Sequence, residues 1–270
     1  MKRTNILSVI FLLVSISSVT AQDIKVPVGK KLQVVVDSKM NMSMSAMGQD
    51  IAMESSNMIA ADYEFKTATS NGYSMTSTMR HMKIRTGAIL GSEMSIDSEN
   101  EDDRKNPAYA EAFNMLNKPI EMVFENNRLT SSGDIGNKLT QMGLPDGIGA
   151  ISTFILLTPN MSLLKPGYQW KDSTNSATTN MIEEYTVTKA DNNEIELQVK
   201  SSLKINTTIK QGEMEIKESM HGTVTSKRMY NKTTGILIKD ESDMEMSGNT
   251  EVMDQQVPLA IKGKTTTTIS

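Results

Sequence analysis

Methionine is the residue type that points most directly to chemistry, since 22 of the 270 residues are methionine. Met40, Met42 and Met44 alternate with polar residues, so in an extended strand their thioethers would project from one face. Two predicted strands later, Met75 and Met79 are predicted to share a face with the imidazole of His81. Thioether sulfur and imidazole suit Cu(I) or Ag(I). One hypothesis is therefore a soft-metal site formed by Met40, Met42, Met44, Met75, Met79 and His81.

The wider distribution of methionine favours a different interpretation. Methionine also replaces Leu and Val in phase with the apolar alternation at Met181, Met220 and Met244, whereas a dedicated metal site would concentrate it in one place. Flexible thioethers suit an adaptable apolar pocket. We predict a ligand cavity lined by Met40, Met42, Met44, Met53, Phe65, Tyr73, Met75, Met79, Ile151 and Phe154. The alternative is that helices of the protein itself pack against this face.

Several catalytic classes lack their residues. The chain has no cysteine, which excludes thiol nucleophiles, thiolate metal sites and disulfides. The two histidines, His81 and His221, cannot form a multi-histidine metal site, and no Gly-x-Ser-x-Gly nucleophile motif accompanies them. The acidic segment from Asp97 to Asp103 lacks the spacing of a calcium loop. We therefore expect a protein that is not an enzyme and carries no cofactor.

The N-terminus has the pattern of a secretory signal peptide over residues 1–21. Lys2 and Arg3 precede an apolar run, and Ala21 supplies the small residue before the cleavage site. We expect an exported protein, periplasmic or extracellular, that is not lipidated because it lacks cysteine. No later segment has the roughly 20 apolar residues of a transmembrane span. The net charge of −4, with both signs interspersed, argues against a nucleic-acid partner. The sequence names no protein partner.

The rest of the chain is dominated by long segments with a period of two. From Leu32 to Ala46 apolar residues alternate with polar ones, and Ile195 to Ile209 repeats the pattern. Strands of about 15 residues are far longer than the usual 5–6 and must curl. We predict a single β-rich domain over 22–270, with a first meander at 30–100 and a second at 167–270.

Between the two meanders, residues 105–160 predict a helical insert. Asn106-Pro107 is typical of a helix start, a second helix would begin at Asp134, and Ile148–Leu157 is apolar on nearly every side. The predicted fold is mainly β. It is a long-stranded, strongly bent antiparallel sheet, a half-barrel or open barrel, with two or three short central helices packed on its concave face.

The opening of the second meander carries a resemblance. Lys165-Pro166-Gly167-Tyr168-Gln169-Trp170, together with the later turn over 230–236, resembles exported bacterial proteins of unknown function in which Gly-x-x-Trp begins a strand-rich half. This resemblance covers most of the mature chain and implies no known activity. In architecture, a bent sheet closed by central helices is also similar to the periplasmic lipoprotein-carrier half-barrels, which hold acyl chains. That likeness is a fold analogy, and a fold alone does not imply a function.

These observations leave three functional hypotheses. The preferred one is a non-catalytic cell-envelope protein that binds or carries a lipid or another apolar or amphiphilic ligand in a methionine-lined cavity. The second is a structural or interaction protein of the envelope with a filled core. The third is Cu(I) or Ag(I) binding through the methionines.

Overall fold

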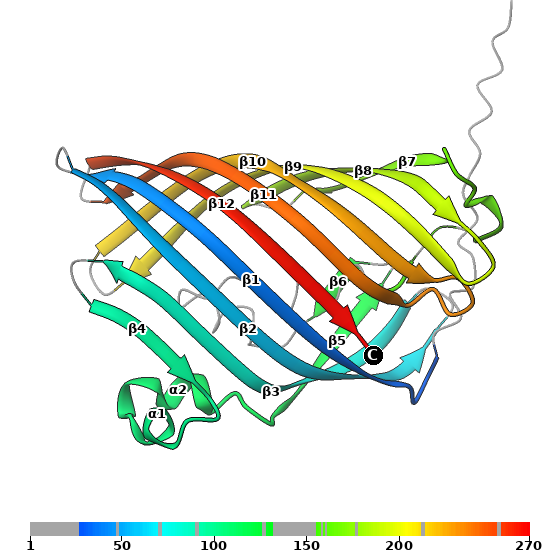
Figure 1. The fold of residues 1–270 in the computed structure, drawn as a ribbon, viewed down its shortest axis with the longest axis horizontal. Coiled ribbons are helices and arrows are strands. Elements are labelled where there is room, and N and C mark those ends of the chain that lie inside the picture. Colours follow the sequence, from blue (N-terminus) through cyan, green and yellow to red (C-terminus); the bar gives the residue numbers. More distant parts are fainter. Residues whose placement is uncertain are drawn as a thin grey trace, which may run out of the picture.

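The computed structural model describes residues 27–46, 49–69, 72–89, 92–125, 128–131, 155–157, 159, 161–175, 178–211, 214–252 and 255–270. Most of these residues are in β-strands (Figure 1). The predicted signal peptide, residues 1–21, lies outside the described residues. No helix in the described part of the chain is long and apolar enough to cross a membrane.

Six strands come from the first half of the chain: β1 (Lys31–Ala46), β2 (Gln49–Ala68), β3 (Gly72–Ile89), β4 (Ser92–Asp97), β5 (Pro119–Glu125) and β6 (Arg128–Ser131). Six more come from the second half: β7 (Gln169–Asn175), β8 (Thr179–Ala190), β9 (Glu194–Gln211), β10 (Met214–Asn231), β11 (Leu237–Val252) and β12 (Gln255–Ile269). Seven of them are 15 to 20 residues long, which confirms the predicted long strands.

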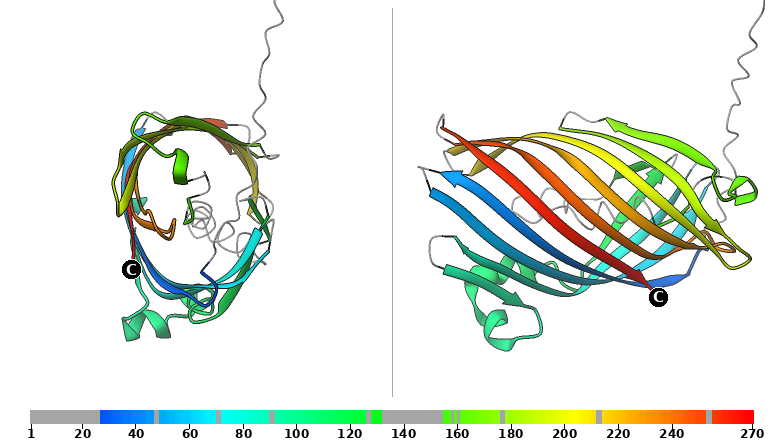
Figure 2. Two further views of the ribbon diagram at one scale, coloured as in Figure 1. Left: turned by 90° about the vertical axis from the view of Figure 1, so that its right-hand side faces the viewer. Right: turned by 45° about the horizontal axis from the view of Figure 1, so that its top comes forward.

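All twelve strands belong to one antiparallel sheet. Its order is β6-β5-β3-β2-β1-β12-β11-β10-β9-β8-β7, and β4 also pairs with β3. The first long strand therefore pairs with the last, as in Val34 with Ile269. The sheet curls around its own interior (Figure 2) but is not closed, because the order ends at β6 and β7. The predicted strongly bent antiparallel sheet is confirmed in this form.

Alternation along each strand gives the sheet a concave and a convex face. On β1, Leu32 and Val34 are buried, whereas Gln33 and Asp37 are exposed. The buried side chains of neighbouring strands lie opposite one another in the ladders, for example Tyr63 opposite Leu32. The apolar residues that the sequence pattern placed on one side thus form the concave face.

One bulge changes which residues of β3 face inward. The register against β2 shifts between Ala60 and Ala61, so that Arg80 is an extra residue between Met79 and His81. Met79 and Met82 are both buried after this shift, and His81 lies on the opposite side of the strand from Met82. The unbroken alternation that placed His81 with Met75 and Met79 therefore does not hold.

The described helices are short and do not form the predicted central layer. α1 (Glu101–Lys105), α2 (Ala110–Phe113) and two 3₁₀ turns, η1 (Pro107–Tyr109) and η2 (Met161–Leu163), are each one turn or little more. α1 and α2 lie beside β4 (Figure 1). The helix predicted after Asp134 falls outside the described residues. Two or three helices on the concave face are therefore not supported.

The one described part of the predicted apolar helix Ile148–Leu157 is extended. Leu156 forms a β-bridge with Ile236, and the Leu157 and Leu237 amides donate to the carbonyls of Gly235 and Ile155. These three apolar residues, 155–157, are buried by pairing with the chain that leads into β11. Continuous apolarity cannot distinguish a buried helix from a buried extended segment, which explains this error.

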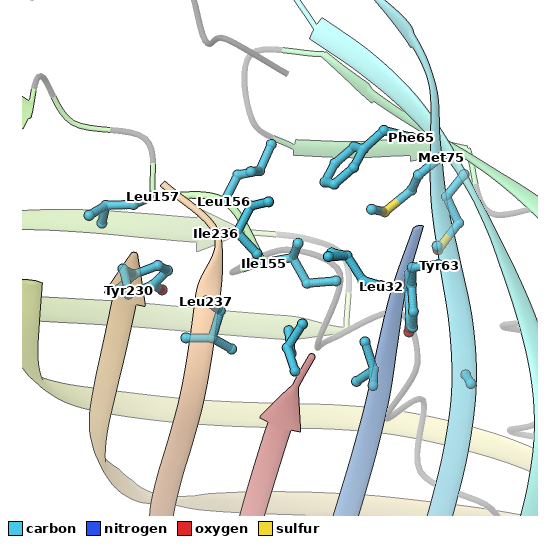
Figure 3. Packing of buried hydrophobic residues seen from close by; sticks show 14 of the residues in the cluster. Leu32, Tyr63, Phe65, Met75, Ile155, Leu156, Leu157, Tyr230, Ile236 and Leu237 are labelled. Carbon is cyan, nitrogen blue, oxygen red and sulfur yellow. The ribbon is translucent and has the colours of Figure 1, made fainter. Parts of the chain in front are cut away.

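A densely buried part of the core lies at one end of the curled sheet, where Ile155 and Leu156 meet Leu32, Tyr63 and Phe65 (Figure 3). Tyr73 stacks on Phe124 across β3 and β5, with ring centroids 4.6 Å apart. We call this region the aromatic end. Its buried members include Leu32, Tyr63, Phe65, Tyr73, Met75, Phe124, Ile155, Tyr230 and Leu237.

Toward the opposite end, methionines lie over glycines of the neighbouring strands. A Cβ placed on Gly248 would lie 2.9 Å from Met220 Sδ, and one on Gly222 would lie 2.8 Å from Met246 Cγ. A Cβ on Gly263 would be 3.0 Å from Met40 Cγ. Glycine in a strand interior often marks a bend or a close approach. Here it leaves room for a long thioether on the next strand.

Alanine substitutions at these glycines should distinguish a clash with the backbone from a clash with a flexible side chain by their effect on stability. In Gly248→Ala the new Cβ would lie 1.9 Å from the Ser219 carbonyl oxygen, so the backbone must move. We expect urea unfolding to show a loss of about 1–3 kcal/mol. Gly263→Ala should cost less, because its nearest contact is the flexible Met40 side chain. Equal losses for the two variants would contradict this account.

Candidate ligand-binding face

A row of small polar side chains crosses the concave face. The ladders place Asn57 opposite Ser38, Ser38 opposite Thr265, Thr265 opposite Ser242, and Ser242 opposite Ser226. The Ser38 and Thr265 hydroxyls are 3.1 Å apart and share a hydrogen bond. The row therefore runs over five neighbouring strands, from β2 to β10. We call these five residues the hydroxyl belt.

The hydroxyl belt divides the concave face into two apolar regions. On β1, Leu32, Val34 and Val36 lie on the side of the aromatic end, and Met40 and the two methionines after it lie on the other side. The second region also receives residues from β2, β10, β11 and β12. We call it the methionine face, formed by Met40, Met42, Met44, Met53, Met220, Met244, Met246, Leu259 and Ile261.

The methionine face is less completely covered than the aromatic end. Met40, Met42 and Met44 are half-buried, as are Met53 and Met244. The large side chains of the aromatic end are buried almost without exception. The chain therefore builds one densely packed apolar region and one apolar region that still touches solvent.

The structure separates the predicted cavity lining into two groups. Met40, Met42, Met44 and Met53 lie together on the methionine face, where Met42 is directly opposite Met53. The other described members lie in the packed aromatic end: Phe65, Tyr73, Met75 and Met79. Ile151 and Phe154 lie outside the described residues. The prediction thus grouped residues that belong to two different regions.

The six residues of the hypothetical soft-metal site are also not brought together. Met75 lies opposite Phe65, whereas Met40 lies opposite Ser55, ten positions earlier on β2. Ten strand residues span roughly 30 Å. His81, the sixth, faces carboxylates and not thioethers. Their donor atoms therefore cannot converge on one ion.

His81 belongs to a small charged cluster that joins β3 to β4. Its Nε2 lies 3.0 Å from Asp97 Oδ1 and its Nδ1 lies 3.8 Å from Glu99 Oε1. These three side chains have the composition of a metal site. However, the Lys83 ammonium lies 2.7 Å from the other Asp97 oxygen. Hydrogen bonds from Lys83, from the Glu99 amide and from His81 hold the pKa of Asp97 well below its usual range. The cluster therefore satisfies its charges internally.

A second charged cluster lies on the concave face beside the hydroxyl belt. Arg228 Nε is 3.2 Å from Asp240 Oδ1, and Arg228 Nη2 is 3.5 Å from Glu183 Oε1. The side chains of Arg228, Asp240 and Glu183 are only 8%, 5% and 15% exposed. The Tyr185 hydroxyl donates to the other Glu183 oxygen at 2.8 Å. We call these four residues the Arg228 cluster.

Burial shifts pKa values within the Arg228 cluster. Burial raises the pKa of Asp240, even though Arg228 opposes this shift. Burial and the nearby Glu183 carboxylate raise the pKa of Tyr185 above its ordinary value, so its hydroxyl keeps the proton that it donates to Glu183. Separating such charges from water is costly unless each is paired. The cluster is therefore stable only as a set.

Arg228, the partner of Glu183 and Asp240, was not among the residues predicted from the sequence. The available signal was the position of Arg228, which is in phase with the apolar residues Val224 and Tyr230 of β10. A cation at an inward position requires a buried anion on a neighbouring strand. Asp240 lies directly opposite it on β11.

The convex face has the opposite character, with charged pairs joining neighbouring strands. Lys227 lies 2.8 Å from Glu196 and Lys262 lies 3.1 Å from Glu245. Exposed pairs of this kind contribute little stability individually. Such pairs nevertheless cover the convex face from β7 to β12 and make it polar. They are Lys171–Glu184, Lys227–Glu196, Lys217–Glu251, Lys262–Glu245 and Lys264–Asp243.

Removing one member of the Arg228 cluster should be more damaging than removing two. Arg228→Met leaves Asp240 buried without its cation, and we expect urea unfolding to show a loss of about 3–5 kcal/mol. Adding Asp240→Leu should restore much of this loss. Lys227 precedes Arg228 and lies on the convex face, so Lys227→Met should lower the free energy of unfolding by no more than about 1 kcal/mol. An Arg228→Met variant as stable as Lys227→Met would contradict the assignment.

Comparison with solved structures shows a likeness of fold. The fold superposes on that of lipovitellin, in a structure of its lipid–protein interactions, with a TM-score of 0.53 and 10% sequence identity. The match covers 90% of this chain, which spans only about a quarter (25%) of the lipovitellin chain. An outer membrane channel from Pseudomonas putida F1 matches with a TM-score of 0.29 and 8% identity over 92% of this chain and 98% of that one. At that score it carries no structural argument.

Comparison of sequences gives a more limited result. No curated protein matches the chain. The resemblance to proteins of unknown function is confirmed in one segment: residues 150–237, which include the Gly-x-x-Trp opening of the second meander and the turn over 230–236, match a family of unknown function, DUF6263.

Proposed function

We propose that the protein is a non-catalytic, exported carrier or binder of an apolar or amphiphilic ligand, which it holds on the methionine face. The observation that carries this proposal is the contrast between the two faces of one sheet. The convex face bears charged pairs, whereas the concave face bears half-buried methionines. An apolar surface that remains partly exposed on the inside of a curved sheet is suited to a ligand.

The composition of the methionine face supports a ligand of variable shape. Methionine is unbranched and polarizable, and it adapts to different partners at binding surfaces. The glycines beneath Met40, Met220 and Met246 leave space on the sheet that these long side chains occupy. The fold likeness to lipovitellin, whose structure describes lipid–protein interactions, agrees with an apolar ligand.

The proposal includes export and the absence of catalysis. Export rests on the signal-like N-terminal sequence. The non-catalytic role rests on how the buried ionisable groups are used. Asp240 and Glu183 are held by Arg228 and Tyr185, so they are positioned as paired groups and not as free acids or bases.

The second hypothesis, a structural envelope protein with a filled core, is favoured by the aromatic end. Phe65, Met75 and Ile155 are fully buried there. The two hypotheses differ only in the methionine face, which must take up a ligand in the first case and remain inert in the second.

Charge placed on the methionine face should weaken binding. We expect the wild-type protein to bind the neutral fluorescent probe N-phenyl-1-naphthylamine saturably. Met42→Glu and Met44→Glu should each weaken binding by about tenfold or more, because a carboxylate is costly beside an apolar ligand. Fluorescence titration gives the affinities, and circular dichroism checks the fold.

Asn41→Glu is the matched control, because Asn41 lies between Met40 and Met42 in sequence but is exposed on the convex face. It should leave the affinity within about twofold of the wild-type value. The absence of saturable binding, or equal binding by all four proteins, would overturn the proposed function and favour the filled-core hypothesis.

A further inference from the structure

The concave face carries more negative than positive charge. Among the described strands, alternation places one cation on this face, Arg228, and that cation is paired with Asp240. Three further carboxylates face the same way, Asp172, Glu183 and Glu218, and Glu183 shares Arg228 with Asp240. Four carboxylates on this face of the described strands therefore have one cation among them. A ligand with a charged headgroup that enters this face therefore meets an excess of anions.

Two of these carboxylates are directly opposite each other at the open edge of the sheet. β7 and β8 pair Asp172 with Glu183 and, two residues along, Trp170 with Tyr185. Like charges directly opposite in a ladder are destabilising. On the convex side of the same two strands the residues that lie opposite each other have unlike charges: the Lys171 ammonium is 2.5 Å from the Glu184 carboxylate. No lysine performs this role on the concave side of the described strands.

An aromatic surface lies beside the two carboxylates. The Trp170 and Tyr185 rings are parallel within 2°, with centroids 4.7 Å apart. The Arg228 guanidinium lies 5.9 Å from the centroid of the Tyr185 ring, which is within the distance of a cation–π interaction. Both rings are only partly buried. Carboxylates next to aromatic rings form the combination that recognises ammonium groups.

The position of these four residues connects them to the methionine face. Across the ladders, Glu183 lies opposite Ser201, Ser201 opposite Val224, and Val224 opposite Met244. Three strand spacings of about 4.8 Å separate β8 from β11, or roughly 14 Å along the sheet. An alkyl chain of moderate length that starts at Glu183 therefore reaches the methionine face.

We propose that the concave face binds amphiphiles with an ammonium headgroup. This inference rests on the proposed function and specifies its ligand class. The ammonium lies between Asp172 and Glu183 and against Trp170 and Tyr185, and the apolar chain lies across β9 and β10 onto the methionine face. Anionic amphiphiles are disfavoured by the same carboxylates.

Three ligands with the same chain length test this specificity: dodecyltrimethylammonium, dodecyl maltoside and dodecanoate. Each is titrated below its critical micelle concentration against the protein loaded with N-phenyl-1-naphthylamine, at low salt and neutral pH. We expect the ammonium ligand to bind about tenfold more tightly than the maltoside, and dodecanoate to bind more weakly than both. The preference should decline as salt is added.

Substitutions at the headgroup site locate the effect. Asp172→Asn and Glu183→Gln should each reduce the affinity for dodecyltrimethylammonium about fivefold and leave the affinity for dodecyl maltoside within about twofold. Glu184→Gln is the control, because Glu184 lies on the convex face with Lys171 and should have no effect. Asp172 is exposed, so its variant should fold even if Glu183→Gln disturbs the Arg228 cluster.

The outcomes distinguish this inference from the proposed function. If the three ligands bind equally and Met42→Glu weakens them all, the ammonium preference is wrong and the proposed function stands. Preferential ammonium binding that survives both Asp172→Asn and Glu183→Gln would also overturn the headgroup site. If none of the three ligands displaces the probe, and the probe itself does not respond to Met42→Glu, the proposed function fails.

Discussion

The pairing of β1 with β12 is the constraint on which the concave face depends. Each of the other strand pairs can form within one half of the chain, because its members come from the same meander. The β1–β12 ladder joins the two halves and runs from Val34–Ile269 to Met44–Leu259. It places the methionines of β1 beside those of β11, with only β12 between them. Without this ladder the sheet would divide into two smaller sheets with two additional edges, and neither of them would enclose a surface.

The register of the strands divides that surface into regions of different polarity. In a continuous ladder the side chains at corresponding positions form rows across the strands. One row of small hydroxyl and amide groups separates the packed aromatic end from the methionine face, and the Arg228 cluster lies beside it. An amphiphile has the same division into polar and apolar parts. This division is the basis on which an amphiphilic ligand is proposed.

Some of this arrangement could be predicted from the sequence, and the limits have physical causes. The alternation from Leu32 to Met44 predicted a long strand with one apolar face, because that signal is local. The bulge at Arg80 and the salt bridge from Arg228 to Asp240 depend on a neighbouring strand, which no local pattern specifies. Residues 155–157 were predicted as helix because an apolar run carries no period that reveals an extended partner.

The same β1–β12 ladder has a consequence for the order of folding. The hairpins of each meander close short loops, whereas Val34 and Ile269 must meet across almost the whole chain. Loop closure costs more entropy as the loop lengthens, and contacts of high sequence separation slow folding. We therefore expect the two meanders to form first and the ladder between the first and last strands to form late. The proposed ligand surface needs this ladder, so we expect it to form late, in the same step as the final fold.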